Sequence, residues 1–269
     1  MLYKAKITAV LFAFFSSILG TYIFFDWHSD NKKLLDFART IVHGNSVTGY
    51  DIEQLNDLIY HTGSFAKNND YFLLPSLGPT PIQILQKGGD CSDKSRLLAA
   101  ILDEMKISAT LVMLAPCDGC PFGHTVVEAQ AADGAIAVDP VYNISFPSSN
   151  GHYYGIKDLR DNSSILQARL DELILKRGSR DKVAFYRGGA DGIHYSYPVT
   201  INWEKNFLTR SIGKFLMWYT DDASLVYRPR WLEDPKLLMS GVLGVISIFS
   251  FLVFLVTILL PHPKVITNR

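Results

Sequence analysis

Two long stretches of the chain contain no charged residue, and they restrict its possible folds more than any other feature. They are Ile7 to Phe25, with 19 residues, and Leu237 to Leu260, with 24 residues. As helices rising about 1.5 Å per residue they would reach roughly 28 and 36 Å, against a bilayer hydrocarbon core of about 30 Å. The first stretch is too long for a signal-peptide core and is not followed by a small-residue cleavage site. Both are therefore expected to be membrane-spanning helices.

The residues between these stretches have the composition of a soluble domain. All 26 basic and 26 acidic side chains of the 269-residue chain lie outside the two apolar stretches. The resulting net charge of zero argues against nucleic-acid binding, and the hydrophobic content of 48% excludes a disordered chain. We therefore expect tails at 1–6 and 261–269, membrane helices at 7–25 and 237–260, and one domain over 30–232.

Flanking charges do not decide on which side of the membrane the domain lies. Lysines and arginines are nearly as frequent next to the tails as next to the domain, so the positive-inside rule is indecisive. A short first tail with two lysines is typical of an end retained in the cytoplasm, which favours an extracytoplasmic domain, periplasmic in a bacterium. Within the spans, Ser16 and Gly20, and Ser240 and Gly244, are small residues one turn apart, which would let the helices pack closely.

Hydrophobic periodicity between the spans predicts an α+β domain. Apolar residues recur at helical spacing over 30–43, 51–63 with Asp51 as N-cap, 91–106, 165–176 and 207–219. Strands are expected over 107–114, 124–131 and 135–139, and again in broken form over 183–203. A turn containing Asp133 and Gly134 would join 124–131 and 135–139 into a hairpin.

Cys91 lies where one of these helices begins, directly after Gly88, Gly89 and Asp90. Unpaired amides at a helix start favour a thiolate and can also hold an oxyanion formed from an attacked carbonyl group. The glycines would let a substrate backbone approach closely. Asp90 and Asp93 oppose the thiolate by their negative charge, so a partner histidine is required.

His124 and Asp139 are the candidate partners of Cys91. They lie on the two strands of the expected hairpin, and with an even-numbered loop both would project from the same face. His124 would act as general base towards Cys91, and Asp139 would fix the tautomer and orientation of the imidazole.

Three segments together resemble the core of the transglutaminase-like superfamily. They are Gly89-Asp90-Cys91-Ser92-Asp93 with the following Leu97 to Leu102, His124-Thr125-Val126-Val127-Glu128, and Val138-Asp139-Pro140-Val141-Tyr142. The resemblance covers about residues 75–145. It implies a papain-like α+β fold, in which a helix bearing the cysteine packs on an antiparallel sheet.

The resemblance also implies site residues and an activity. Cys91 would be the nucleophile, His124 the base and Asp139 the orienting acid of a cysteine peptidase, amidase or transglutaminase. By papain-like analogy Gln86 would assist the oxyanion. The family often has an aromatic residue just after its histidine, where this chain has Thr125-Val126-Val127.

Two further cysteines allow other interpretations of the same region. Cys117 and Cys120 with Cys91 and His124 have a spacing that permits a structural zinc site, although Asp139 would then have no role. Alternatively, Cys117 and Cys120 form a small loop disulfide, which suits a domain outside the cytoplasm.

The function expected from the sequence is acyl transfer on an amide or peptide bond at a membrane. The expected partners are the lipid bilayer and a protein, peptide or envelope-polymer assembly close to it. No phosphate-binding glycine loop is found, so no organic cofactor is expected. A catalytic metal is not expected either. The alternative is an inactive transglutaminase-like module that serves as a membrane-bound binding or assembly protein.

Overall fold

The computed structural model describes residues 2–44, 46–117, 119–196, 207–220, 231 and 233–259. The chain divides into two compact units. The first contains 1–29 and 234–269, and the second contains 30–233. The two units are described separately below.

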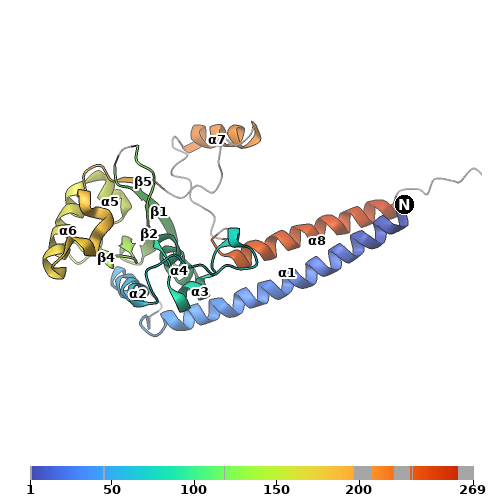
Figure 1. Ribbon diagram of the computed structural model, residues 1–269, viewed down its shortest axis with the longest axis horizontal. Coiled ribbons are helices and arrows are strands. Elements are labelled where there is room, and N and C mark those ends of the chain that lie inside the picture. The colour runs from blue at the N-terminus through green and yellow to red at the C-terminus, as the bar shows by residue number, and fades with distance from the viewer. Residues whose placement is uncertain are drawn as a thin grey trace, which may run out of the picture. The chain divides into compact units, whose positions relative to one another are not determined.

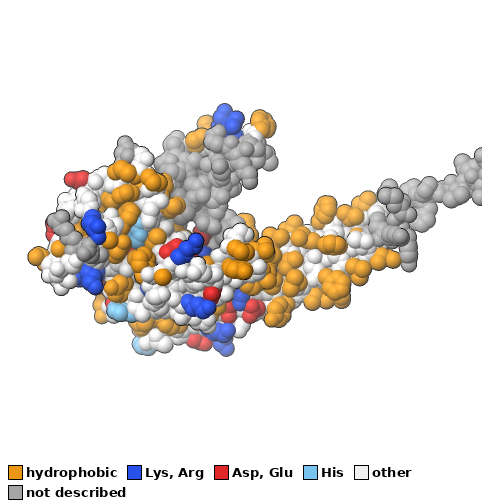
Figure 2. Space-filling model, in the orientation of Figure 1, with side chains coloured by type: hydrophobic (Ala, Val, Ile, Leu, Met, Phe, Trp, Pro, Cys, Tyr) orange, Lys and Arg blue, Asp and Glu red, His pale blue; other side chains and the backbone are white. Residues whose placement is uncertain are grey.

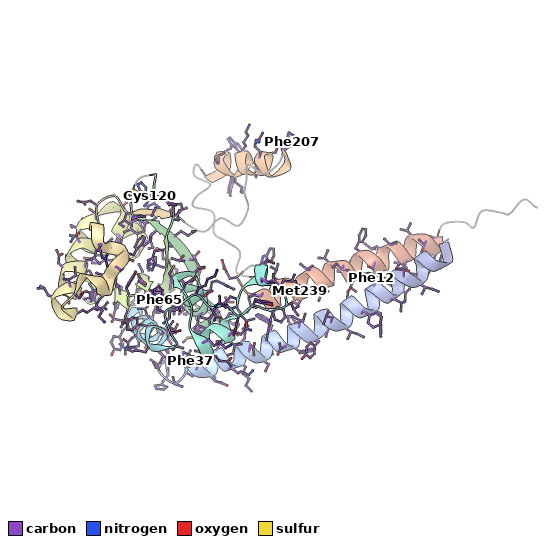
Figure 3. The ribbon with its side chains drawn as sticks, viewed as in Figure 1. Phe12, Phe37, Phe65, Cys120, Phe207 and Met239 are labelled. Carbon is purple, nitrogen blue, oxygen red and sulfur yellow. A yellow bond between two sulfur atoms is a disulfide. The ribbon has the colours of Figure 1, made fainter. Side chains whose placement is uncertain are left out.

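The first unit consists of two long helices, α1 (Leu2–Ala38) and α8 (Pro235–Leu259) (Figure 1). The last residues of α1, from Asp30 on, belong to the second unit. The segments Lys6–Ala38 and Pro235–Leu259 are long and apolar enough to cross a membrane. Figure 2 shows mostly hydrophobic side chains on the surface of this helix pair, and Phe12 and Met239 are labelled there in Figure 3. Phe15 and Val245 are 63% and 67% exposed, as expected for side chains that face lipid.

Of the small residues expected at a helix contact, Gly20 and Ser16 of α1 lie against α8, whereas an added Cβ at Gly244 would have no neighbour within 4 Å. A Cβ atom added to Gly20 would lie 3.1 Å from Cβ of Leu243, and Ser16 is buried. The hydroxyl of Ser247 donates a hydrogen bond of 3.0 Å to the carbonyl of Ala13. Small side chains thus let the two backbones approach, as the spacing predicted.

One expectation about α1 is wrong. The sequence suggested a break between the apolar segment and an amphipathic helix over 30–43, but the structure has one continuous helix that ends at Ala38. No glycine or proline lies between Asp26 and Ala38, so nothing interrupts the backbone hydrogen bonds.

The second unit is an α+β domain with a five-stranded antiparallel sheet in the order β4-β3-β2-β1-β5. The strands are β1 (Ala109–Ala115), β2 (His124–Ala131), β3 (Gly134–Asp139), β4 (Ile144–Ser145) and β5 (His194–Ser196). The hairpin of β2 and β3 has the predicted bounds to within one residue. Helices cover both faces of the sheet, which explains why β1 and β2 are rich in apolar residues instead of strictly alternating.

Alternate strand residues point into two separate cores. On one face, Leu111, Val127 and Val138 pack with α2 (Gly49–His61) and α4 (Cys91–Glu104). On the other, Val112, Val126 and Ala137 pack with α5 (Ile156–Asp161), α6 (Ser163–Arg177) and the 3₁₀ segment η2 (Arg180–Gly188). The apolar faces of α4 and η2 therefore pack against opposite faces of the sheet.

The caps of the short helices follow from single residues. Thr48, and not Asp51 as expected, is the N-cap of α2, and Asp51 is instead the third-residue partner of its capping box. The same box recurs in α3 (Pro81–Lys87), where Thr80 pairs with Gln83. Buried Lys94 donates from Nζ to the carbonyls of Ile59 and Tyr60 at 3.1 and 2.9 Å, at the end of α2.

The region 183–203 differs from the expectation of several strands. Val183 lies in η2, β5 is the strand found among its described residues, and the part from residue 197 lies outside them. Buried Val183 and Tyr186 face the second core from η2, so their apolar pattern reflects burial and not strand pairing. The helix expected at 207–219 is found as α7 (Phe207–Thr220), and a second short 3₁₀ turn, η1, spans Pro75–Leu77.

Candidate active site

Cys91 is the first residue of α4. Asp90 is the N-cap: its carboxylate accepts from the amide of Asp93 at 3.0 Å, and the Asp93 carboxylate accepts from the amide of Asp90 at 3.4 Å. Arg96 lies 3.5 Å from Asp93. The two acids that seemed to oppose a thiolate are thus engaged in starting the helix, and Cys91 itself is partly exposed.

Gly88 and Gly89 are required by close contacts before the cysteine. Gly88 ends α3 with φ +85°, and a Cβ there would lie 2.1 Å from the carbonyl oxygen of Ser64. A Cβ at Gly89 would lie 2.4 Å from Cβ of Asp93. The two glycines therefore let the chain pass between Ser64 and α4, which sets the position of Cys91.

The hairpin register places His124 and Asp139 on one face. Ala131 pairs with Gly134 across a two-residue turn, and Val127 pairs with Val138. Asp139 thus lies at the level of Val126, and His124 is two residues further along the same side of β2. The even-numbered loop gives the geometry that the sequence predicted.

The structure brings the three predicted side chains together. Nε2 of His124 donates to Oδ2 of Asp139 at 2.7 Å, and both side chains are buried. The Cys91 side chain is close enough to His124 to contribute a hydrogen-bonding and a charge effect to the pKa of that histidine. Because Asp139 occupies Nε2, Nδ1 is the ring nitrogen left to face the sulfur.

Electrostatics favour a protonated imidazole at this site. Burial alone would lower the pKa of His124, but the charge and hydrogen bond of Asp139, with a further effect of Cys91, outweigh it and raise the pKa to about 9. Burial likewise acts to raise the pKa of Asp139, yet His124 and the amides of Val141 and Tyr142 bring it below its usual value. An imidazolium next to a sulfur stabilises negative charge on that sulfur.

Three aromatic residues around the imidazole were not predicted as part of the site. The rings of Phe185, Tyr142 and Tyr186 lie 4.8, 5.2 and 5.8 Å from the ring of His124, measured between centroids. Tyr186 also donates from its hydroxyl to Oδ2 of Asp139 at 2.9 Å. No fixed spacing links η2 to the hairpin, so only the adjacent aromatic residues Phe185 and Tyr186 could have indicated them.

Gln86, the expected oxyanion helper, lies on α3 with an exposed side chain. The structure gives it no contact with Cys91 that would define a role, and its function stays a prediction. The first-turn amides of α4 are the other donors near the sulfur.

Cys117 and Cys120 are joined by a disulfide in the loop between β1 and β2, where Figure 3 labels Cys120. Their sulfurs bond to each other, which removes two of the four ligands from the zinc alternative. No group of three or more His, Cys, Asp or Glu side chains arranged for a metal occurs among the described residues.

The chain matches no protein-family model, and comparisons with curated proteins and with solved structures find no match.

Proposed function

We propose that the domain is a cysteine-dependent acyl-transfer enzyme acting on amide or peptide bonds, with Cys91 as nucleophile, His124 as general base and acid, and Asp139 as orienting acid. One observation carries the proposal: a partly exposed sulfur at a helix start lies next to a buried imidazole whose other nitrogen is held by a buried carboxylate. The proposal includes the papain-like arrangement expected from the resemblance to the transglutaminase-like superfamily.

The chemistry follows from the positions of these groups. The Cys91 sulfur attacks the carbonyl carbon, and a C–S bond forms as the carbonyl electrons move to oxygen. The amides of Cys91 and Ser92 are placed to hold this oxyanion, since the amide of Asp93 is taken by Asp90 and that of Lys94 closes the first turn. The tetrahedral intermediate then collapses, the C–N bond breaks, and His124 gives its proton to the departing amine.

The thioester is released by a second nucleophile. Water yields a carboxylic acid, and a second amine yields a new amide; in both cases His124 accepts the proton of the attacking group and the sulfur leaves as the thiolate. The aromatic rings that enclose the imidazole keep its proton from bulk water, while Cys91 as a residue is partly exposed. Hydrolysis and cross-linking use the same residues, and the acceptor decides between them.

Membrane attachment is the second part of the proposal. Both apolar helices would span the bilayer, and the domain would lie outside the cytoplasm, because the Cys117–Cys120 disulfide persists in an oxidising compartment. The substrate would then be a protein, peptide or envelope polymer near the membrane surface.

The test is trapping of the acyl-enzyme. The full chain in nanodiscs is incubated with a library of amide and peptide substrates, quenched in acid and examined by intact-mass spectrometry. We expect a mass increase by the acyl group that hydroxylamine removes, and that Cys91→Ala lacks. Asp171→Asn, an exposed carboxylate on α6, serves as the folded control with unchanged adduct formation. Absence of any adduct, with Cys91 unreactive towards alkylating agents at pH 6, would favour a binding module.

A further inference from the structure

The Asp139 carboxylate receives four hydrogen bonds, two on each oxygen. The backbone amides of Val141 and Tyr142 donate to Oδ1 at 2.9 and 3.1 Å. Nε2 of His124 and the hydroxyl of Tyr186 donate to Oδ2 at 2.7 and 2.9 Å. Local backbone therefore fixes one oxygen, whereas the oxygen that faces the imidazole is shared with a residue 47 positions further along the chain.

Tyr186 is suited to remain a donor at every pH in which the protein is folded. Its side chain is buried at 4% exposure in the second core. Burial and the nearby Asp139 carboxylate raise its pKa well above the usual value of 10, so the phenol stays neutral. The hydroxyl hydrogen therefore always points to an acceptor, and Oδ2 is the acceptor present.

The segment η2 also contacts the imidazole ring of His124, through the ring of Phe185. Phe185 lies over the ring with an interplanar angle of 32°. The amide of Phe185 donates to the hydroxyl of Tyr142 at 3.1 Å, and Tyr142 is the third ring next to the imidazole. Two consecutive residues of η2 thus contact the His124–Asp139 pair, one through the ring face and one through the carboxylate.

We propose that Tyr186 is a positioning residue of the active site, which holds the Asp139 carboxylate in the orientation that directs Nδ1 of His124 at the Cys91 sulfur. This inference rests on the proposed function and extends it to a fourth residue. A carboxylate held through Oδ1 alone can rotate about its Cα–Cβ and Cβ–Cγ bonds, and the imidazole would follow it. The hydroxyl prevents this rotation and also withdraws negative charge from Oδ2, which weakens the attraction between the carboxylate and the imidazolium.

The experiment compares Tyr186→Phe with Tyr154→Phe in the full chain in nanodiscs. Tyr154 packs against the same core, just before α5, and makes no hydrogen bond to Asp139 in the described structure. Two measurements are made: the pH dependence of Cys91 alkylation, and the titration of His124 by NMR with ¹⁵N-histidine. Of the seven histidines, the signal of His124 is assigned by its loss in His124→Ala.

We expect Tyr186→Phe to slow Cys91 alkylation at pH 7 by about three- to tenfold, the range for loss of one buried hydrogen bond. The alkaline end of the His124 titration should move to higher pH, because Oδ2 then carries more negative charge. Other titratable groups facing this site are Cys91 from α4, Tyr142 after β3, Arg177 from α6 and Tyr195 from β5. Tyr154→Phe should leave both measurements unchanged.

The outcomes separate this inference from the proposed function. If Tyr186→Phe lowers only the melting temperature and leaves the His124 titration and the alkylation profile unchanged, Tyr186 is structural and the inference is wrong. If both measurements change while no acyl adduct forms with any substrate, the positioning role stands and the proposed activity fails. If adducts form equally in wild type and Tyr186→Phe with the same titration, the activity stands without this residue.

Discussion

Replacing Asp139 with asparagine should move the reactivity of Cys91 to alkaline pH. Asn keeps the size of the side chain and removes the charge that opposes the burial of His124. Without it, burial dominates and the pKa of His124 should fall from about 9 to below the ordinary value of 6.5. The difference between 9 and 6.5 corresponds to about 3 kcal/mol of interaction with the protonated ring.

The assay uses the fact that Cys91 is the free cysteine of the chain. The chain has three cysteines and the other two form a disulfide, so alkylation with iodoacetamide reports Cys91 alone. At pH 6 we expect Asp139→Asn to react about tenfold more slowly than wild type, or slower still, because the imidazolium that stabilises the thiolate is lost. At pH 10 the two proteins should differ by less than about threefold, because the thiolate then forms without a cationic partner.

The wild-type chain should also differ from Asp139→Asn in how its folding stability depends on pH. The raised pKa of His124 means that the pair stabilises the folded chain fully below pH 6.5 and loses this contribution as the pH rises to about 9. The lowered pKa of Asp139 means that the contribution is also lost in acid, as the pH falls below the usual carboxyl pKa of 3.8. Identical pH profiles of alkylation and of melting temperature in wild type and Asp139→Asn would refute the coupling between these residues.

Three further predictions concern the support of the site, the two apolar helices and the disulfide. Gly88→Ala should destabilise the domain by about 2 kcal/mol or more in chemical denaturation, because its new Cβ would collide with Ser64. The control Gly178→Ala has a similar positive φ but open space around it, and should cost about 1 kcal/mol. Equal effects of the two substitutions would contradict the close contact with Ser64. Gly20→Leu should lower the melting temperature in detergent, because overpacking against α8 costs about 1–3 kcal/mol of folding free energy. Gly241→Leu should not lower it, because an added Cβ there has no neighbour within 4 Å. If neither variant changes the melting temperature, α1 and α8 do not pack at Gly20. Thiol titration of the denatured chain should find one reactive cysteine before reduction and three after it, and three before reduction would exclude the disulfide.

The sequence by itself determined the features that depend on local spacing. Uncharged length indicated the two long apolar helices α1 and α8, and the period of apolar residues indicated α4 and the hairpin of β2 and β3. The even-numbered turn then placed His124 and Asp139 on one face, because side chains in a strand alternate strictly. The position of Cys91 at a helix start could also be predicted, because Asp90 and Asp93 have the spacing of a capping box.

Tertiary structure alone decided what surrounds these residues. Tyr186 contacts Asp139 across 47 positions, and nothing in the local pattern of η2 distinguishes this contact from ordinary burial. Strands and a 3₁₀ segment can bury the same apolar residues, so Val183 and its neighbours were misassigned. A local pattern indicates which face of a helix or strand is buried. Which segment packs against that face depends on residues far away in the sequence. The packing of such distant segments supplies the environment in which His124 is protonated.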